Sequence, residues 1–554
     1  MIRFYCLITI IIREGFTIDL EDNFEADIFL NIPYAKPPVG ELRFEKPQPP
    51  ESWKGVREAK NFGHGCLPHV QGHWDTVAPY TSEDCLSLNI FRPHKKSKSP
   101  EGYPVLVWVH GGGFCTGNAI LYGFNNISNN FVRQDLVVIT IQYRLGHLGF
   151  VSTGDEVMPG NYGLWDLAQA FKFIHENIED FGGDPKKITA WGLSAGGALV
   201  SALSLSPHSR DYIARSIEMS GVVLATWASS DAVITATEEL ALELSCTNQD
   251  SKKVKECFKK KSTQEILDAS EKIGKARYDL NLLKWQPRID GDFFPKDYPE
   301  LIKEATPKPA VIGFADVESA YFTLLCYTMS LNEICIPKDR WSSYGEQNLT
   351  YFIKEIVAPE NVFGKDTKEV QKALIEFYVN HNKPQNADYN FYLERYTQIF
   401  SDANFNIPGL WTAQQKMEAK WPVYLYLTEH YNKGVLPKDL PVKGAVHAAE
   451  YPYIFGLMVL GQHEFDEADK VVHKTLVEAI GSFAKTGNPS TSSLQWPKLS
   501  KNHPLRYLDI KGEPEVEEPL MEERLKFWNE LTEKYDFDII RGLYKGTQRT
   551  KDEL

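Results

Sequence analysis

The feature that most constrains the fold of this chain is a short glycine-rich turn at residues 192–196. It reads Gly-Leu-Ser-Ala-Gly, and a further glycine follows at position 197. An apolar, β-branched stretch precedes the turn at 188–191, and an apolar helical stretch follows at 198–205. A backbone that reverses sharply from a strand into a helix has no room for side chains beside the central serine, so glycine is needed there. The bare pattern is common by chance, but in this context it predicts a nucleophile elbow that presents Ser194.

A serine hydroxyl is a weak nucleophile, so such a site also needs donors for an oxyanion, a base, and an acid that orients the base. The sequence His-Gly-Gly-Gly-Phe at 110–114 directly follows a second apolar stretch at 105–109. Successive glycines allow backbone N–H groups to approach a tetrahedral oxygen closely. A flexible turn is the alternative interpretation. We expect the amides of Gly112, Gly113 and Ala195 to form the oxyanion hole.

The base and the acid are harder to assign from the pattern. In an α/β hydrolase the acid and then the histidine follow the nucleophile along the chain. His447 lies in a loop of small residues at 444–450, and Glu318 follows a strand-like stretch at 310–313. The chain has 14 histidines and 74 acidic residues, so composition alone selects neither residue.

Short apolar stretches alternate with amphipathic segments along the chain. Buried strands are predicted at 105–109, 136–141 and 188–191, and a helix at 164–178. This alternation is typical of an α/β fold, in which helices flank a large, mostly parallel sheet. The sequence contains no repeat, low-complexity tract or linker. We therefore predict one domain with long insertions over residues 16–550.

Charge and motif content argue against several kinds of partner. The net charge of -14 disfavours nucleic acid and anionic membranes, which attract cationic surfaces. No apolar run reaches the roughly 18 residues that a membrane span requires. The chain has no CxxC or HExxH motif, so we expect neither a metal nor another cofactor.

The two ends of the chain point to the secretory pathway. Residues 4–12 form an apolar stretch of the length of a signal-peptide core; no small-x-small cleavage site follows, and a buried strand is the alternative. We predict a signal peptide over residues 1–15. The chain ends in Lys-Asp-Glu-Leu at 551–554, an address read by the retention receptor of the endoplasmic reticulum. Asn126 and Asn348 are acceptable glycosylation sites. The expected location is the lumen of the endoplasmic reticulum.

Eight cysteines in so long a chain do not make a disulfide scaffold. In an oxidising lumen, however, a bridge can stabilise a loop that lacks its own core, mainly by restricting the unfolded chain. Two pairs bracket such loops: Cys66 with Cys85, and Cys246 with Cys257. The pairing of Cys326 with Cys335 is left open, and Cys6 and Cys115 are expected to be free or, for Cys6, removed with the signal peptide.

Further motifs extend over most of the chain. They are Ile-Pro-Tyr-Ala at 32–35, Pro-Pro-Val-Gly at 37–40, Leu-Arg-Phe at 42–44, Ser-Glu-Asp-Cys-Leu at 82–86, Asn-Tyr-Gly at 161–163 and Phe-Gly-Gly-Asp-Pro at 181–185. Together with 110–114 and the elbow, they resemble the type-B carboxylesterases and cholinesterases of the α/β-hydrolase superfamily. The likeness extends from about residue 29 to about residue 496. The terminal tetrapeptide adds a likeness to luminal carboxylesterases such as the gut esterases of nematodes.

The resemblance implies an α/β-hydrolase fold and a serine esterase that cleaves small-molecule carboxylic esters through an acyl-enzyme. By the same likeness, Ser194 is the nucleophile, Glu318 the acid and His447 the base, without a cofactor. Ser220 resembles a serine that supports the acid in the family. The likeness also implies the following pairs: the two disulfides Cys66–Cys85 and Cys246–Cys257, and the ion pairs Arg43–Glu83 and Arg144–Asp166.

Two other functions stay open. A neutral-lipid lipase is the nearest rival, and activity that rises sharply at a lipid interface would favour it. A non-catalytic adhesion or binding protein is the rival from another class, because the resembled family contains members with a broken triad. Labelling with an active-site phosphonate distinguishes an esterase from such a binding protein, since only a working nucleophile reacts. The sequence does not indicate an oligomeric state.

The chain departs from the family pattern at two informative positions. Leu193 stands where the family usually has glutamate, which predicts an apolar wall beside the nucleophile. Trp74 in the 66–85 loop is a weaker alternative source of a cation-binding face. Asn31 stands where the family has glycine, and asparagine tolerates positive φ better than most residues.

Overall fold

The computed structural model describes residues 14–69, 80–274, 276–277, 279–326, 334–535, 537–538, 541 and 543–544. The predicted signal peptide up to residue 13 and the retention tetrapeptide at 551–554 lie outside these ranges. An 11-stranded sheet dominates the described chain.

The sheet is parallel in its centre and antiparallel at both edges. Its strands lie in the order β1 (Phe16–Asp19), β2 (Glu25–Pro33), β5 (Ser87–Pro93), β7 (Val137–Ile141), β6 (Tyr103–Val109), β8 (Gly183–Leu193), β9 (Arg215–Met219), β10 (Ala310–Ala315), β11 (Val423–Thr428), β12 (Tyr507–Ile510) and β13 (Glu515–Glu517). Neighbours from β7 to β12 pair in parallel. The predicted mostly parallel sheet and its three predicted strands are confirmed. Two short pairs stand apart: β3 (Gly65–Cys66) with β4 (Thr81–Ser82), and β14 (Phe537–Asp538) with β15 (Leu543–Tyr544).

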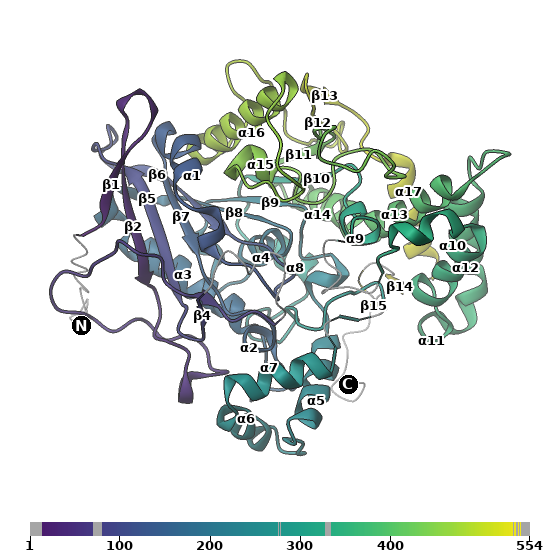
Figure 1. Ribbon diagram of the computed structural model, residues 1–554, viewed down its shortest axis with the longest axis horizontal. Coiled ribbons are helices and arrows are strands. Elements are labelled where there is room, and N and C mark those ends of the chain that lie inside the picture. Colours follow the sequence, from purple (N-terminus) through teal and green to yellow (C-terminus); the bar gives the residue numbers. More distant parts are fainter. Residues whose placement is uncertain are drawn as a thin grey trace.

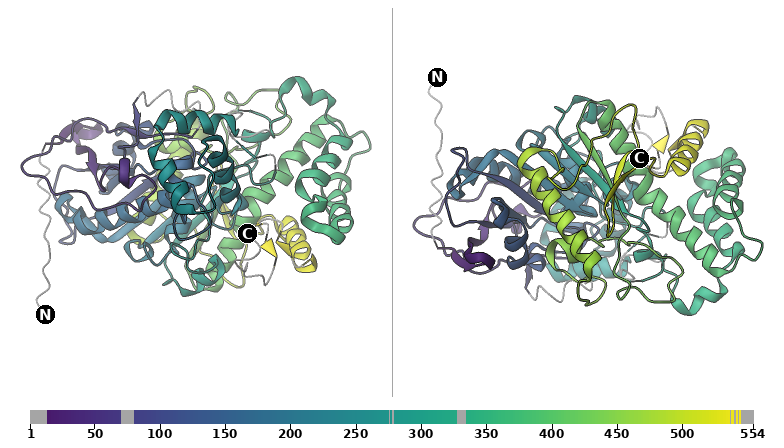
Figure 2. Two further views of the ribbon diagram at one scale, coloured as in Figure 1. Left: turned by 90° about the horizontal axis from the view of Figure 1, so that it is seen from below. Right: turned by 90° about the horizontal axis from the view of Figure 1, so that it is seen from above.

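Helices follow most of the strands. They are α1 (Asn125–Asn130), α2 (Gly146–Phe150), α3 (Tyr162–Asn177), α4 (Ala195–Leu203), α5 (Ala232–Glu243), α6 (Ser251–Lys260), α7 (Thr263–Lys272), α8 (Tyr298–Glu304), α9 (Ala320–Thr323), α10 (Glu346–Phe352), α11 (Glu360–Phe363), α12 (Thr367–Ile375), α13 (Tyr389–Ser401), α14 (Ile407–Glu418), α15 (Tyr451–Phe455), α16 (Glu467–Thr486) and α17 (Glu522–Tyr535). Helix α3 confirms the helix predicted at 164–178. The strands β1 and β2 lie at one end of the molecule, and α10 to α13 lie at the other (Figures 1 and 2).

Successive side chains of the central strands belong alternately to two separate hydrophobic cores. On β6, Val105 and Val107 belong to the larger core, whereas Leu106 and Trp108 belong to the other. This follows from the two-residue period of a strand, whose neighbouring side chains point to opposite faces. Helices α3 and α4 supply residues to the first core, and α1 and α16 supply residues to the second. Both faces of the central strands are covered, as expected for apolar, β-branched parallel strands.

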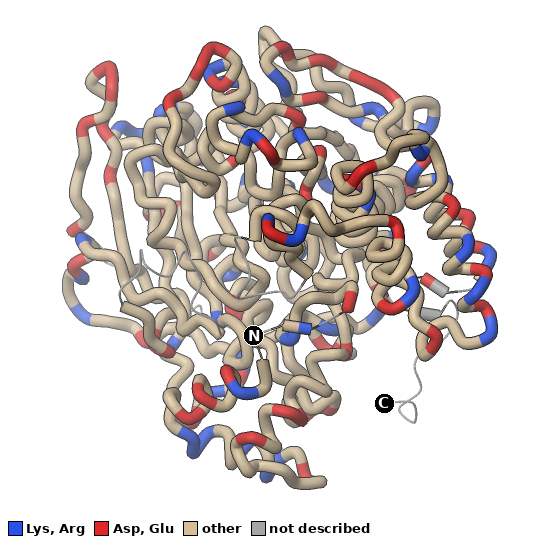
Figure 3. The backbone as a smooth tube through the Cα atoms, turned by 45° about the vertical axis from the view of Figure 1, so that its right-hand side comes forward, with Lys and Arg blue, Asp and Glu red and all other residues tan. Residues whose placement is uncertain are grey.

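Charged residues lie mainly outside these layers. Acidic and basic residues are interspersed along the outer loops and helices (Figure 3). Within the ranges described above, no helix is long and apolar enough to cross a membrane.

Disulfides close three local loops. The expected pairs Cys66–Cys85 and Cys246–Cys257 are both present. Cys326 also pairs with Cys335, which answers the question that the sequence left open. Cys115 is buried and free, as expected, and Cys6 lies outside the described residues.

The ion pairs implied by the resemblance are present. Arg43 Nε donates to Glu83 Oε2 at 2.6 Å, and Arg144 Nε donates to Asp166 Oδ2 at 2.8 Å. Asn31 has φ 56°, so this asparagine occupies the left-handed conformation that glycine adopts most easily.

Candidate active site

The turn between β8 and α4 is as sharp as the glycine pattern predicts. Ser194 has φ 60°, and its amide donates to Met219 O at 2.8 Å. A Cβ added to Gly196 would lie 2.1 Å from Val109 O, and one on Gly192 would lie 2.4 Å from the Gly196 backbone. Both positions therefore exclude any side chain. This close packing presents the half-buried Ser194 at the end of the strand.

The glycine loop after β6 lies directly against the elbow. A Cβ on Gly111 would be 2.6 Å from Leu193 O and 3.2 Å from Ser194 Cβ. Gly112 and Gly113 have φ of 115° and 59°, conformations that side chains rarely adopt. In the described chain, the N–H groups of these two glycines and of Ala195 donate to no protein acceptor. All three amides are thus available to an oxygen beside Ser194.

Glu318 and His447 meet although 129 residues separate them in sequence. His447 Nδ1 lies 2.6 Å from Glu318 Oε2, and Glu318 Oε1 accepts from Ala315 N at 2.8 Å. Glu318 is 0% exposed and His447 4%. The carboxylate is therefore held on both oxygens and orients the imidazole. Ser220, by contrast, is buried, and its hydroxyl has no hydrogen-bond partner among the described residues.

A cavity of about 120 Å³ lies between the elbow, the glycine loop and His447. Its lining includes Ser194, His447, Gly112, Gly113 and many apolar side chains. The predicted nucleophile, base and two of the predicted oxyanion donors thus border one space. The sequence did not single out its aromatic walls, formed by Tyr122, Trp227, Tyr321, Phe322, Phe400, Phe405 and Tyr451. They come from separate elements and share no motif.

Glu450 is a second buried carboxyl group near the Glu318–His447 pair. It is 0% exposed and accepts from Tyr426 and Thr428 hydroxyls at 3.2 Å each, while its Oε2 has no partner among the described residues. Burial, reinforced by the charge of Glu318, raises the pKa of Glu450 to about 7. The sequence placed Glu450 in the loop of His447 but offered no sign of its burial.

Glu450 is expected to make stability fall as the pH rises. Its folded pKa lies above the ordinary value of 4.5, so the folded state binds this proton more tightly than the unfolded state. The contribution is complete below pH 4.5 and is lost as the pH rises through 7. From pH 5 to pH 8 the free energy of unfolding of the unmodified protein should therefore decrease. In the Glu450→Gln variant, which mimics the protonated carboxyl, this decrease should be smaller by about 2 kcal/mol. Urea unfolding at both pH values measures the difference.

The exposed Glu522 provides the control for this measurement. Glu522→Gln should lose as much stability as the unmodified protein over the same pH range. Equal losses in Glu450→Gln and Glu522→Gln would contradict the burial of a protonated Glu450.

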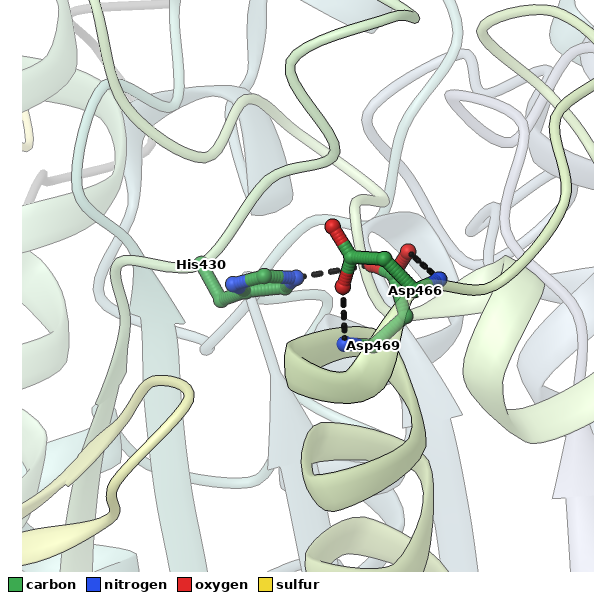
Figure 4. A group of neighbouring side chains, drawn as sticks. All are labelled: His430, Asp466 and Asp469. Atoms are coloured by element: carbon green, nitrogen blue, oxygen red, sulfur yellow. Dashed lines mark hydrogen bonds and ion pairs between the residues drawn. The ribbon is translucent and has the colours of Figure 1, made fainter.

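Two clusters of acidic residues outside the cavity have the proximity of metal ligands. In the first, His430, Asp466 and Asp469 meet at the start of α16 (Figure 4). Asp469 Oδ1 lies 2.7 Å from His430 Nε2 and accepts from Tyr453 OH at 2.8 Å. Asp469 Oδ2 accepts from Asn432 Nδ2 at 2.6 Å and from the amide of Asp466 at 2.9 Å. Protein donors therefore use both carboxylate oxygens, and the cluster is a helix cap.

The second cluster contains Asp509, Glu515 and Glu517. The Lys511 ammonium lies between 2.5 and 2.9 Å from all three carboxylates. An ammonium thus already occupies the position that a cation would take.

Comparison with known proteins gives a consistent result. A model of the carboxylesterase family matches residues 13–528. Gut esterase 1 of Caenorhabditis elegans is 38% identical over 536 residues, which cover 96% of this chain and 94% of that protein. The acylcarnitine hydrolase of Rattus norvegicus is 34% identical over 519 residues, 90% of this chain and 86% of that protein. The cocaine esterase of Homo sapiens is 32% identical over 517 residues, with coverage of 90% and 86%.

Proposed function

The chain belongs to the carboxylesterase family and hydrolyses carboxylic esters, and from that premise we propose that Ser194, Glu318 and His447 carry out the reaction. His447 Nε2 takes the proton of the Ser194 hydroxyl as the hydroxyl oxygen attacks the ester carbonyl carbon. The carbonyl oxygen becomes an oxyanion, which accepts hydrogen bonds from the amides of Gly112, Gly113 and Ala195.

The tetrahedral intermediate then collapses to an acyl-enzyme. The C–O bond to the alcohol breaks, and the His447 imidazolium gives its proton to the leaving oxygen. Glu318 stabilises the imidazolium through the 2.6 Å contact at Nδ1. Water, activated by His447, attacks the acyl carbon in the same way and releases the carboxylic acid.

The observation that carries the proposal is the shared cavity, which Ser194, His447 and the glycine loop all line. The experiment that tests it is labelling with a fluorescent active-site phosphonate. The purified protein should bind one equivalent, and the labelled peptide should contain Ser194. Failure of the native protein to react, or a label on another residue, would exclude the assignment.

We further propose that the enzyme resides in the lumen of the endoplasmic reticulum, where a retention receptor binds residues 551–554. Three disulfides support an oxidising compartment. Of the two sequons, Asn348 is the better acceptor: it is exposed on α10, and no acceptor is found for its Nδ2 in the described chain. Asn126 Nδ2 instead donates to Phe455 O at 2.8 Å, a bond that a glycan would break.

Deleting residues 551–554 is expected to move active enzyme into the medium of expressing cells, because the retention receptor no longer returns it. Esterase activity and immunoblots of medium and cells measure the shift, and the full-length chain is the control. Secreted protein should carry a glycosidase-sensitive glycan that Asn348→Gln removes or reduces. A truncated protein that stays inside, unglycosylated and with Cys66 and Cys85 reduced, would contradict a luminal location.

A further inference from the structure

The cavity beside Ser194 has two chemically different walls. Trp227, Phe322 and Phe405 form one wall, and the only polar hydrogen among these side chains, on Trp227 Nε1, is donated to Asn404 O at 2.7 Å. A second wall contains Leu193, Tyr122 and Tyr451, which pack together in one hydrophobic cluster. The lining holds one further phenol, Tyr321, whose ring lies 5.3 Å from that of Phe322.

Tyr122 and Tyr451 hydrogen-bond to each other. Their hydroxyl oxygens lie 3.2 Å apart, and each residue is 6% exposed. Two phenol groups hold two protons, and the mutual bond uses one of them. Neither hydroxyl donates to any further acceptor in the described chain. Burial raises the pKa of Tyr122 to about 12, so it remains a donor at neutral pH. The pair therefore keeps one proton that no acceptor in the described chain uses, on two residues that line the cavity.

The position of this wall points to the alcohol half of a substrate. The leaving oxygen must lie beside His447, and the chain continues from that residue through Ala448 to Tyr451, whose amide donates to Ala448 O at 3.1 Å. The rings of Phe322 and Phe405 also lie 5.0 Å from the His447 ring, so the alcohol half fits between these rings and the tyrosine pair. Trp227 instead lies toward the glycine loop, because Phe114 contacts it with ring centroids 6.0 Å apart. That side suits the acyl chain, whose carbonyl oxygen points to the loop.

We propose that the Tyr122–Tyr451 pair selects esters whose alcohol half carries a second hydroxyl group, such as monoesters of diols. This inference rests on the proposed triad. A substrate hydroxyl loses its water on entering an apolar cavity, and the tyrosine pair replaces the lost hydrogen bonds. Leu193 supplies no charge on this wall, so a neutral hydrogen-bonding group suits it.

The expected preference is modest for a structural reason. The two tyrosines bond to each other, so with an alkyl ester bound each hydroxyl keeps one hydrogen bond and only one donor hydrogen lacks an acceptor. The preference then equals the net value of one hydrogen bond, about fivefold in kcat/KM. A site that left its own polar group unpaired would discriminate far more strongly.

Matched substrates test the proposal on the unmodified enzyme. Butanoates of 1,2-ethanediol, 1,3-propanediol and 1,4-butanediol, each a monoester, are compared with propyl, butyl and pentyl butanoate. Each kcat/KM is divided by the rate constant for hydroxide-catalysed hydrolysis of the same ester, which removes intrinsic reactivity. At least one diol ester should exceed its partner about fivefold. Parity across the series, or the same preference for a hydroxyl placed on the acyl half, would overturn the proposal.

The double variant Tyr122→Phe/Tyr451→Phe should reverse the preference, because the substrate hydroxyl would then be buried without a partner. The ratio of kcat/KM for the best diol ester to kcat/KM for its alkyl partner should fall by more than about fivefold. Tyr34→Phe is the control: Tyr34 is fully buried and donates to Gln142 O at 2.6 Å, away from the cavity lining, so the ratio should not change.

An unchanged ratio in a folded double variant would overturn the proposal alone, leaving the triad intact. Loss of hydrolysis of every ester by the unmodified enzyme, together with failure of phosphonate labelling, would overturn both. If the double variant does not fold, the substrate series on the unmodified enzyme decides.

Discussion

Replacing Ser194 with alanine is expected to lower kcat by about 10⁵-fold to 10⁶-fold, since the covalent pathway disappears. His447→Ala should lower it by a similar factor. Because the two residues act as one unit, the double variant should be little worse than either single variant. Steady-state hydrolysis of a neutral aryl ester, with circular dichroism and thermal unfolding of each variant, measures the effect.

Folding should survive the change at Ser194. The positive φ of this residue is held by backbone bonds, from its amide to Met219 O at 2.8 Å and from Ala198 N to its carbonyl oxygen at 3.0 Å. Alanine retains both. Ser201→Ala on the same helix is the matched control, because its buried hydroxyl has no hydrogen-bond partner among the described residues. Near-normal turnover by Ser194→Ala, or a comparable loss in Ser201→Ala, would contradict the assignment.

Local chemistry explains why so much of the fold could be predicted. A parallel strand buried on both faces must be apolar throughout, which made β6, β7 and β8 visible as short β-branched stretches. The elbow and the glycine loop each lie within a few consecutive residues. Their backbone conformations exclude side chains, so these segments are recognisable in the sequence by their glycines.

Contacts between segments that are distant in the sequence have no such local pattern and could not be predicted in this way. Glu318 meets His447 only because β10 and β11 are neighbours in the sheet, and the resemblance rather than the pattern identified this pair. The burial of Glu450 depends on packing against Tyr426 and Thr428 of β11. The cavity walls join single aromatic residues from several elements, and an isolated aromatic residue in a sequence does not differ from any other core residue.

Choline esters are expected to be much poorer substrates than neutral esters of the same shape. The comparison is acetylcholine against 3,3-dimethylbutyl acetate, which replaces the charged nitrogen with carbon. Leu193 is 1% exposed and lines the cavity beside Ser194, so a quaternary ammonium on this wall meets no carboxylate. Burying a cation unpaired costs several kcal/mol, whereas contact with aromatic faces returns about 0.5–2 kcal/mol. We expect kcat/KM for acetylcholine to be lower by at least about 100-fold.

Glu450 does not replace the missing charge. Its pKa of about 7 keeps much of it protonated near neutral pH, and it is not among the residues that line the cavity. The other source of cation binding considered from the sequence, Trp74, lies outside the described residues. The apolar wall at Leu193 thus accounts for the expected preference for neutral esters over choline esters.

Two substitutions at Leu193 distinguish the effect of a charge on choline-ester hydrolysis from the effect of polarity alone. Leu193→Glu should narrow the gap between the two acetates about tenfold, because Tyr122 and Tyr451 lie in the same cluster and can donate to the new carboxylate. Leu193→Gln has nearly the same volume and no charge, and should not narrow the gap. Comparable kcat/KM for the two acetates in the unmodified enzyme would contradict the role of Leu193. We expect glutamate alone to narrow the gap, since only a carboxylate offsets the lost hydration of the cation. Equal narrowing by glutamine and glutamate would instead show that polarity rather than charge controls entry of the cation.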